Sequence, residues 1–267
     1  MIGLIYSCTK HINFLLVKTD MHIKILGCGS IASQKNCSSY LVGINDKYLL
    51  MDIGPGAYSQ LIKEKVSQEK ISAILITHTH ADHANDLAAF LWRAMFGTKR
   101  KSPLTIIGPK RFKKFFSKIE LLYPHIKKAK FKILIKEADE NANALNLDGI
   151  KIIARQVKHS KYSNAYRVES GGKSIAYSGD TDYCDSILKI SESANILILE
   201  CSMPDGKKVS GHLTPSECGK IAHKSNVKTL VLTHTYPECE SKDIKTDVFK
   251  YYKGEILNAK DLMVLKC

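Results

Sequence analysis

Short apolar runs alternate with segments of helical periodicity along most of the chain. Runs of about four to eight apolar residues are the length of buried strands, whereas apolar residues that recur every three or four positions form one face of a helix. Strand-like runs occupy residues 23–26, 73–76, 150–157, 174–177, 195–199 and 229–232, and helix-like segments occupy 87–95 and 112–123. This order predicts an α/β fold that begins near Met21.

Two of the expected helices carry further signals. Thr214, Pro215 and Glu217 have the order of a capping box with proline at the first helical position, so a helix is expected to begin there. In the segment 112–123 the phenylalanines fall on the apolar face. This period favours a place in the core over a platform for stacking nucleic-acid bases.

A histidine-rich stretch follows directly after the run 73–76. It places His78, His80, Asp82 and His83 on the turn that ends a buried strand. Imidazole nitrogen and carboxylate oxygen are common ligands of divalent transition metals. A solvated polar loop has no need of three of the chain's ten histidines. We therefore interpret the cluster as a metal site, and its spacing suits two adjacent ions rather than one.

Further candidate ligands follow later strand-like runs. His159, Asp180 and His234 each come shortly after such a run, and Asp52 follows the apolar residues 49–51. Taken singly, each is an ordinary loop or turn residue. Their occurrence at the ends of successive strands favours a shared role at one site.

The order of these residues resembles the motifs of the metallo-β-lactamase superfamily of binuclear metal hydrolases. The resemblance extends from about Met21 to the C-terminus, and it implies a four-layer αββα sandwich. It also implies the role of each residue. One ion would be held by His78, His80 and His159 and the other by Asp82, His83 and His234, with Asp180 bridging the two. Asp82 would also act in catalysis. Asp52 would orient a ligand histidine by a hydrogen bond from behind.

The resemblance further implies chemistry at two divalent ions about 3.5–4 Å apart. Such a pair can hold a hydroxide at neutral pH and stabilise both oxygens of a phosphoryl displacement. Zinc is the expected metal because histidine nitrogen dominates the set, with manganese or iron left open. True β-lactamases commonly have cysteine in place of Asp180 and lack His83, and the diiron redox branch has glutamate in place of His80. Antibiotic hydrolysis and electron transfer are therefore disfavoured.

A second pair of residues narrows the substrate class. Glu200 ends the run 195–199, and His212 lies two residues before the capped helix. These positions, together with the turn Gly108-Pro109-Lys110, resemble the ribonuclease Z branch, in which such a pair protonates the leaving oxygen. A nearby carboxylate raises the pKa of an imidazole, as a general acid requires. The alternative is a strand-end charge and an unrelated loop histidine.

Basic residues are concentrated in one part of the chain. Between Arg93 and Glu137 there are 14 lysines and arginines against two acidic residues, a net charge of +12 out of +14 for the whole chain. Such a concentration favours binding of RNA or another polyanion. A solvated basic helix face is the ordinary alternative, and a homodimer is left open.

The spacing of the later motifs leaves the substrate open. Many ribonuclease Z enzymes have a long arm that grips tRNA between the histidine and the aspartate that correspond to His159 and Asp180. Only residues 160–179 separate them here. The resemblance therefore implies a phosphodiesterase that acts on RNA or on a cyclic phosphodiester. A lactone or thioester hydrolase, and a metal-containing nucleic-acid-binding protein without activity, are the alternatives.

The cysteine content and the hydropathy of the chain indicate the cellular compartment of the protein. The eight cysteines include no Cys-x-x-Cys pair, so they are typical of reduced cytosolic thiols. No apolar stretch approaches the ~18 residues that a membrane span requires. We expect a cytoplasmic protein with no membrane partner.

Residues 1–20 precede the first strand-like run, and we expect them to be a dispensable extension of a hydrolase domain at 21–267. A chain that begins at Met21 should therefore fold with the same melting temperature as the full chain. Thermal denaturation followed by circular dichroism checks this, and a shortened chain that fails to fold would contradict it.

Overall fold

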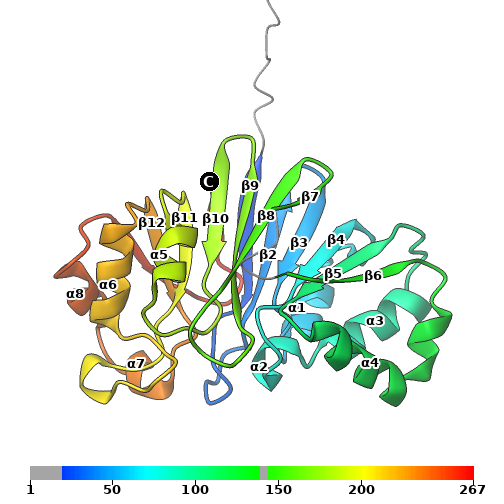
Figure 1. Cartoon of the computed structure of the whole chain (residues 1–267), viewed down its shortest axis with the longest axis horizontal. Coiled ribbons are helices and arrows are strands. Elements are labelled where there is room, and N and C mark those ends of the chain that lie inside the picture. The colour runs from blue at the N-terminus through cyan, green and yellow to red at the C-terminus, as the bar shows by residue number, and fades with distance from the viewer. Residues whose placement is uncertain (1–19, 139–143) are drawn as a thin grey trace, which may run out of the picture.

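Two seven-stranded β-sheets pack face to face, with helices on their outer sides (Figure 1). The structure is a computed structural model, and it describes residues 20–138 and 144–267. The predicted four-layer αββα sandwich is confirmed. The expected extension at 1–20 lies, apart from Asp20, outside the described residues.

The first sheet comes from the N-terminal half of the chain and one C-terminal strand. In spatial order it contains β14 (Val264–Lys266), β1 (Met21–Gly27), β2 (Ser39–Ile44), β3 (Lys47–Met51), β4 (Ile71–Leu75), β5 (Leu104–Gly108) and β6 (Ile133–Glu137). Strands β3 to β6 run parallel. Its outer face packs against α1 (Ala57–Lys63), α3 (Leu87–Phe96) and α4 (Phe112–Leu122).

The second sheet comes from the C-terminal half. In spatial order it contains β13 (Glu255–Asn258), β12 (Thr229–Thr233), β11 (Ile196–Glu200), β10 (Lys173–Tyr177), β9 (Asn164–Ser170), β8 (Ile150–Gln156) and β7 (Leu145–Leu147). Strands β10 to β13 run parallel. Its outer face packs against α5 (Asp185–Ser191), α6 (Pro215–Lys224) and α8 (Ile244–Phe249).

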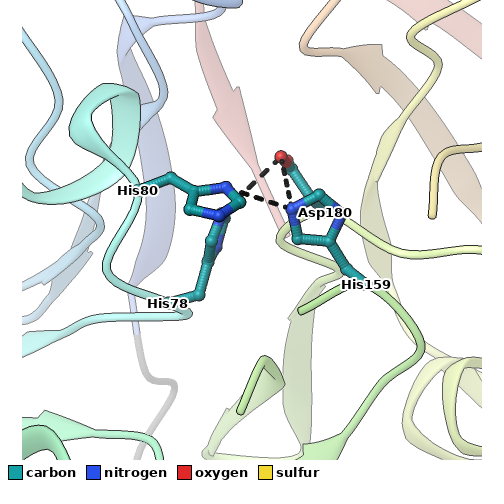
Figure 2. Close-up of side chains that lie close together, drawn as sticks. All are labelled: His78, His80, His159 and Asp180. Carbon is teal, nitrogen blue, oxygen red and sulfur yellow. Dashed lines mark hydrogen bonds and ion pairs between the residues drawn. The ribbon is translucent and has the colours of Figure 1, made fainter. Parts of the chain in front are cut away.

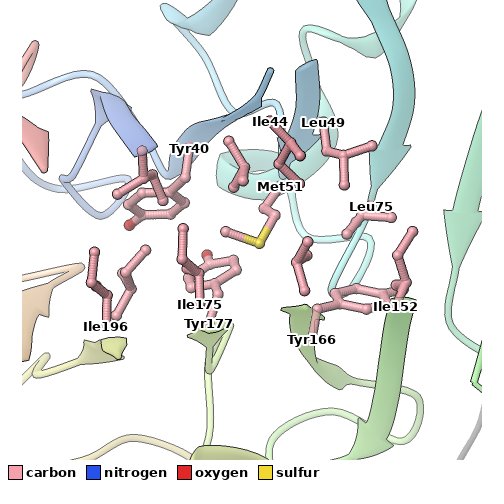
Figure 3. Close-up of a cluster of buried hydrophobic side chains, with 14 of the residues drawn as sticks. Tyr40, Ile44, Leu49, Met51, Leu75, Ile152, Tyr166, Ile175, Tyr177 and Ile196 are labelled. Carbon is pink, nitrogen blue, oxygen red and sulfur yellow. The ribbon is translucent and has the colours of Figure 1, made fainter. Parts of the chain in front are cut away.

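The main core lies between the two sheets (Figure 3). Met51 and Leu75 of the first sheet face Ile175 and Tyr177 of the second, and all four are almost completely buried. Alternate residues of β3 point into this core or toward the helices, as the two-residue period of a strand requires. Each sheet is thus apolar on both faces, which explains its nearly continuous apolar strands.

The helical signals of the sequence are confirmed. Both predicted amphipathic segments are helices, α3 and α4, and Phe112 and Phe116 are buried in the core. At α6, the Thr214 side chain accepts from the backbone while the Glu217 side chain accepts from the N–H of Thr214, as in a capping box. In the described parts of the chain, no helix is both long enough and apolar enough to cross a bilayer.

The parallel strands direct several chain turns to one edge of the sandwich. Strands β3, β4 and β5 end at this edge in the first sheet, and β10, β11 and β12 end there in the second. Hydrogen bonds join the two sheets at this edge: Asn164 N, at the start of β9, donates to Thr77 O at 2.9 Å, and His234 N donates to Cys28 O, after β1, at 2.8 Å. Polar side chains at strand ends are therefore gathered in one place.

Candidate metal centre

The structure brings together all seven residues that the sequence proposes as metal ligands. Their nitrogen and oxygen atoms form groups whose members lie within 4.8 Å of one another. One group is His78, His80, His159 and Asp180, a second is Asp82, His83 and His234, and a third joins Asp180 and His234 to His212. Each group could hold a metal ion. The first two groups correspond to the ligand sets that the resemblance implies, and the assignment of ligands stays a prediction.

The first group draws its members from three chain turns (Figure 2). His78 and His80 follow β4, and His159 comes from the loop after β8. The Nε2 atoms of His78 and His159 lie 3.7 and 3.6 Å from Asp180 Oδ2. His80 Nδ1 lies 3.2 Å from His159 Nε2. The ring of His80 is exposed, so solvent reaches the group from that side.

The second group is built on one turn of helix. Asp82 and His83 lie on α2 (Ala81–Ala84), and His234 follows β12. His234 Nε2 lies 3.3 Å from Asp82 Oδ2 and 3.4 Å from His83 Nε2. Asp180 Oδ1 lies 3.2 Å from His83 Nε2 and 3.5 Å from His234 Nε2. The two oxygens of Asp180 thus face different groups, as a bridging carboxylate requires.

The electrostatics of the cluster fit a bound cation. His78 Nε2 is buried and has no hydrogen-bond partner among the described residues. Such an orphaned atom is costly unless it has a partner of another kind. Burial alone would raise the pKa of Asp180, but His234 and His83 hold it well below its ordinary value. Burial also lowers the pKa of His78, which keeps its imidazole neutral, the form that binds metal.

Asp52 supports the second group from behind. Its carboxylate is completely buried and accepts four hydrogen bonds. These come from Thr77 N at 2.7 Å, Thr77 Oγ1 at 2.8 Å, His83 Nδ1 at 2.7 Å and Tyr177 Oη at 2.8 Å. Since Nδ1 of His83 is engaged with Asp52, its Nε2 points toward Asp180. Asp52 therefore holds the orientation of His83.

Two of the site residues have a strained backbone. Asp52 and His234 have φ angles of 56° and 53°, a region that residues other than glycine rarely adopt. Gly179, which precedes Asp180, has a φ of 56°, and a Cβ there would approach the Thr77 side chain to 2.7 Å. Only glycine fits this position. Strain of this kind persists where the surrounding structure fixes the geometry of a functional site.

Glu200 and His212 lie beside the two groups. His212 Nδ1 donates to Glu200 Oε1 at 3.0 Å, and the His212 ring centre is 4.8 Å from that of His159. The buried Glu200 carboxylate also accepts from Thr181 N, Leu213 N, and both the N–H and the hydroxyl of Ser202. Burial alone would lower the pKa of His212, but the hydrogen bond and charge of Glu200 raise it.

Three contacts at the centre have no local signal in the sequence. Ser202 Oγ lies 3.2 Å from His212 Nδ1 and 3.1 Å from His234 Nδ1, and so joins the Glu200–His212 pair to a candidate ligand. His159 Nδ1 donates to the carbonyl oxygen of Gly211 at 3.0 Å, which directs its Nε2 toward Asp180. These partners lie 10 to 52 residues apart in the chain, so periodicity and motif spacing do not connect them.

Comparison with known sequences identifies relatives over most of the chain. A family profile described as "Beta-lactamase superfamily domain" matches residues 47–235. The probable metallo-hydrolase YhfI of Bacillus subtilis is 27% identical over 90% of this chain and 97% of its own. A protein of Pyrococcus horikoshii named ribonuclease Z is 28% identical over 84% of this chain and 89% of its own.

Solved structures agree with these matches. The crystal structure of YhfI from Bacillus subtilis, described as a metallo-β-lactamase fold protein, superposes with a TM-score of 0.82 at 26% identity. It covers 94% of this chain and 100% of its own. The short form of human tRNase Z superposes with a TM-score of 0.77 at 25% identity and covers 92% of this chain and 98% of its own.

The Asp52 contacts generate a prediction about metal affinity. The substitution Asp52→Asn keeps the shape of the side chain but replaces one of its two acceptor oxygens with an amide NH₂ group. Either His83 or Thr77 then loses the acceptor of its hydrogen bond. We expect the affinity for zinc to fall about 10–100-fold, as is typical when the outer partner of a metal-binding histidine is lost. Competition with a chromophoric chelator measures this. Asp148→Asn, which alters an exposed carboxylate paired with Lys47, is the control, and equal affinity of the two variants would contradict the assignment.

Proposed function

Because this chain belongs to the β-lactamase superfamily, we propose that it is a binuclear metal-dependent phosphodiesterase of the ribonuclease Z type, acting on RNA or a cyclic phosphodiester. The observation that carries the proposal is the Glu200–His212 pair beside the candidate metal groups. Phosphodiester hydrolysis has a leaving alkoxide that must gain a proton. A thiolate leaves a thioester without a proton, so thioester hydrolysis gives this pair no role, whereas lactone hydrolysis also has a leaving alkoxide and is separated from the proposal by experiment.

The proposed ligands are those that form the two groups, with Asp180 shared between them. Zinc is the proposed metal because five of the seven residues are histidines, with manganese or iron as alternatives. When bound, two such ions would supply an activated water and would offset the negative charge that develops on the phosphate oxygens. Asp82 is proposed to act in catalysis as well as in metal binding.

The chain's own residues then complete the reaction. Glu200 accepts from His212 Nδ1, and its charge favours the protonated imidazole. The proton on His212 Nε2 is therefore available to the leaving oxygen. Ser202, Thr181 and Leu213 fix the Glu200 carboxylate so that it does not rotate away from the imidazole. The pair acts because Glu200 orients the His212 imidazole and raises its pKa, and neither side chain has to move.

The relatives of this chain support RNA as the substrate class. Two of the proteins to which this chain is similar are named ribonuclease Z and tRNase Z, and their names refer to action on RNA. The basic segment Arg93–Glu137 offers the charge that RNA binding needs, and Lys110, Lys113 and Lys114 at the start of α4 are exposed. RNA is therefore the proposed natural substrate class, with cyclic phosphodiesters as the alternative.

Hydrolysis of bis(p-nitrophenyl) phosphate tests the reaction type. Metal-replete protein should release p-nitrophenolate, and both EDTA and the substitution Asp180→Ala should abolish the release. Absorbance and the metal content of each sample are measured together. Bound metal without turnover of this ester would contradict the proposal. Turnover of lactones or thioesters would then indicate a carboxyl-ester-type hydrolase. Affinity for RNA without any turnover would indicate a nucleic-acid-binding protein.

The role of His212 generates a separate prediction. We expect His212→Ala to slow hydrolysis of a dinucleotide, whose leaving group is a poor one, by about 10²–10⁴-fold, the usual contribution of general acid–base catalysis. The loss with bis(p-nitrophenyl) phosphate should be smaller, because p-nitrophenolate leaves without a proton. Metal content should remain that of the wild type. His223→Ala, an exposed histidine on α6, is the control, and equal losses with both substrates would exclude a proton-donating role.

A further inference from the structure

The loop that carries His159 also carries an aromatic ring approached by two cations. The guanidinium carbon of Arg111 lies 5.6 Å from the centre of the Tyr162 ring, and Lys161 Nζ lies 5.8 Å from it. Both cations are exposed, and Tyr162 is half-buried. Arg111 is some 50 positions away in sequence, so this cluster is a product of the fold. We call it the Arg111–Tyr162–Lys161 cluster.

Hydrogen bonds place the cluster at the same edge as the metal centre. Tyr162 is three residues from His159, and Asn164, two residues further, donates its backbone N–H to Thr77 O beside His78. The Asn164 side chain donates to Ala138 O at 2.7 Å, and Ala138 N donates to Gly108 O at 2.9 Å. Gly108 ends β5, three residues before Arg111. The loop and the start of α4 are thus fastened to the turn that carries the candidate ligands.

The backbone of Arg111 is left-handed, with φ and ψ angles of 69° and 10°, at the residue that precedes α4. Asparagine or glycine adopts this conformation more readily than arginine does.

The charge of the cluster indicates an anionic ligand. Within residues 20–138 and 144–267 neither Arg111 nor Lys161 forms an ion pair with a carboxylate. Lys110 and Lys158, next to the cluster in sequence, are exposed as well. The exposed cations offer N–H donors to a phosphate group, and the fork of a guanidinium matches its oxygens.

The surface along this loop is open to an extended substrate. A shallow hollow lies against residues 156–161, and its lining includes His159, Lys161 and, from α5, Ser186. Lys161 therefore borders both the hollow and the Tyr162 ring, while His159 borders both the hollow and Asp180. A chain that leaves the metal centre across this loop would pass the cluster.

We infer that the Arg111–Tyr162–Lys161 cluster binds a phosphate group next to the scissile one, so that the substrate is an oligoribonucleotide rather than a cyclic mononucleotide. The inference rests on the proposed function, and it narrows the substrate from RNA or a cyclic phosphodiester to an oligoribonucleotide. Tyr162 holds the two cations in place, and the cations bind the flanking phosphate. A substrate with a single phosphate has nothing for the cluster to bind.

Kinetics with two substrates test the inference. The metal-replete double variant Arg111→Asn/Lys161→Gln is compared with wild type on hexauridylate and on bis(p-nitrophenyl) phosphate. We expect the KM for hexauridylate to rise about tenfold or more relative to the KM for the ester, since charged hydrogen bonds to phosphate are lost. Asparagine tolerates the backbone of position 111, so the variant should fold. Its melting temperature is measured to verify this.

A matched control removes the same charge from contacts of the same kind. In Lys220→Gln/Lys253→Gln, the two lysines lie over the rings of Tyr251 and Phe249. This control should give the wild-type ratio of the two KM values. An equal rise of KM for both substrates in the Arg111/Lys161 variant, or no rise at all, would overturn the inference.

A measurement of RNA binding, made without turnover, tests this inference independently of the proposed function. If wild-type protein hydrolyses neither substrate, the phosphodiesterase proposal fails. The affinity for fluorescein-labelled hexauridylate in EDTA then still tests the cluster. Weaker binding by the Arg111→Asn/Lys161→Gln variant than by the control pair supports the phosphate site, and equal binding overturns it.

Discussion

The buried carboxylate of Asp52 is the constraint on which the metal centre depends. It lies at the end of β3, and a hydroxyl from Tyr177 of the second sheet reaches it across the core. A buried charge is tolerated only when hydrogen bonds replace its hydration, and four donors do so here. The same contacts fix His83 and the turn after β4. The packing of the sheets and the geometry of the site are therefore parts of one network.

The arrangement of the sheets explains why so many polar groups are buried at one edge. Parallel strands on each side direct their carboxyl ends to the same place, and each strand end contributes one or two polar side chains. Tyr40 Oη and Thr233 Oγ1, 2.7 Å apart, form a second polar contact across the core. Such contacts hold the relative position of the sheets more strictly than apolar packing alone, because hydrogen bonds depend on direction as well as distance.

Much of the fold could be predicted from the sequence, because its signals are local. The apolar faces of α3 and α4, the capping box at Thr214 and the buried strands before each candidate ligand are all visible within a few residues. The positions of Ser202, Gly211 and Tyr162 could not be predicted, since each acts through a residue that is near only after folding. The left-handed backbone of Asp52 and His234 was equally hidden, because aspartate and histidine tolerate this conformation but rarely adopt it.

Each candidate metal group contains side chains from both halves of the chain. His78 and His83 come from the first half, and His159, Asp180 and His234 come from the second. An ion bound to either group therefore cross-links the two halves. An ion that binds only the folded chain would stabilise it by mass action. The supply of metal would then govern the lifetime of the folded chain as well as the proposed activity.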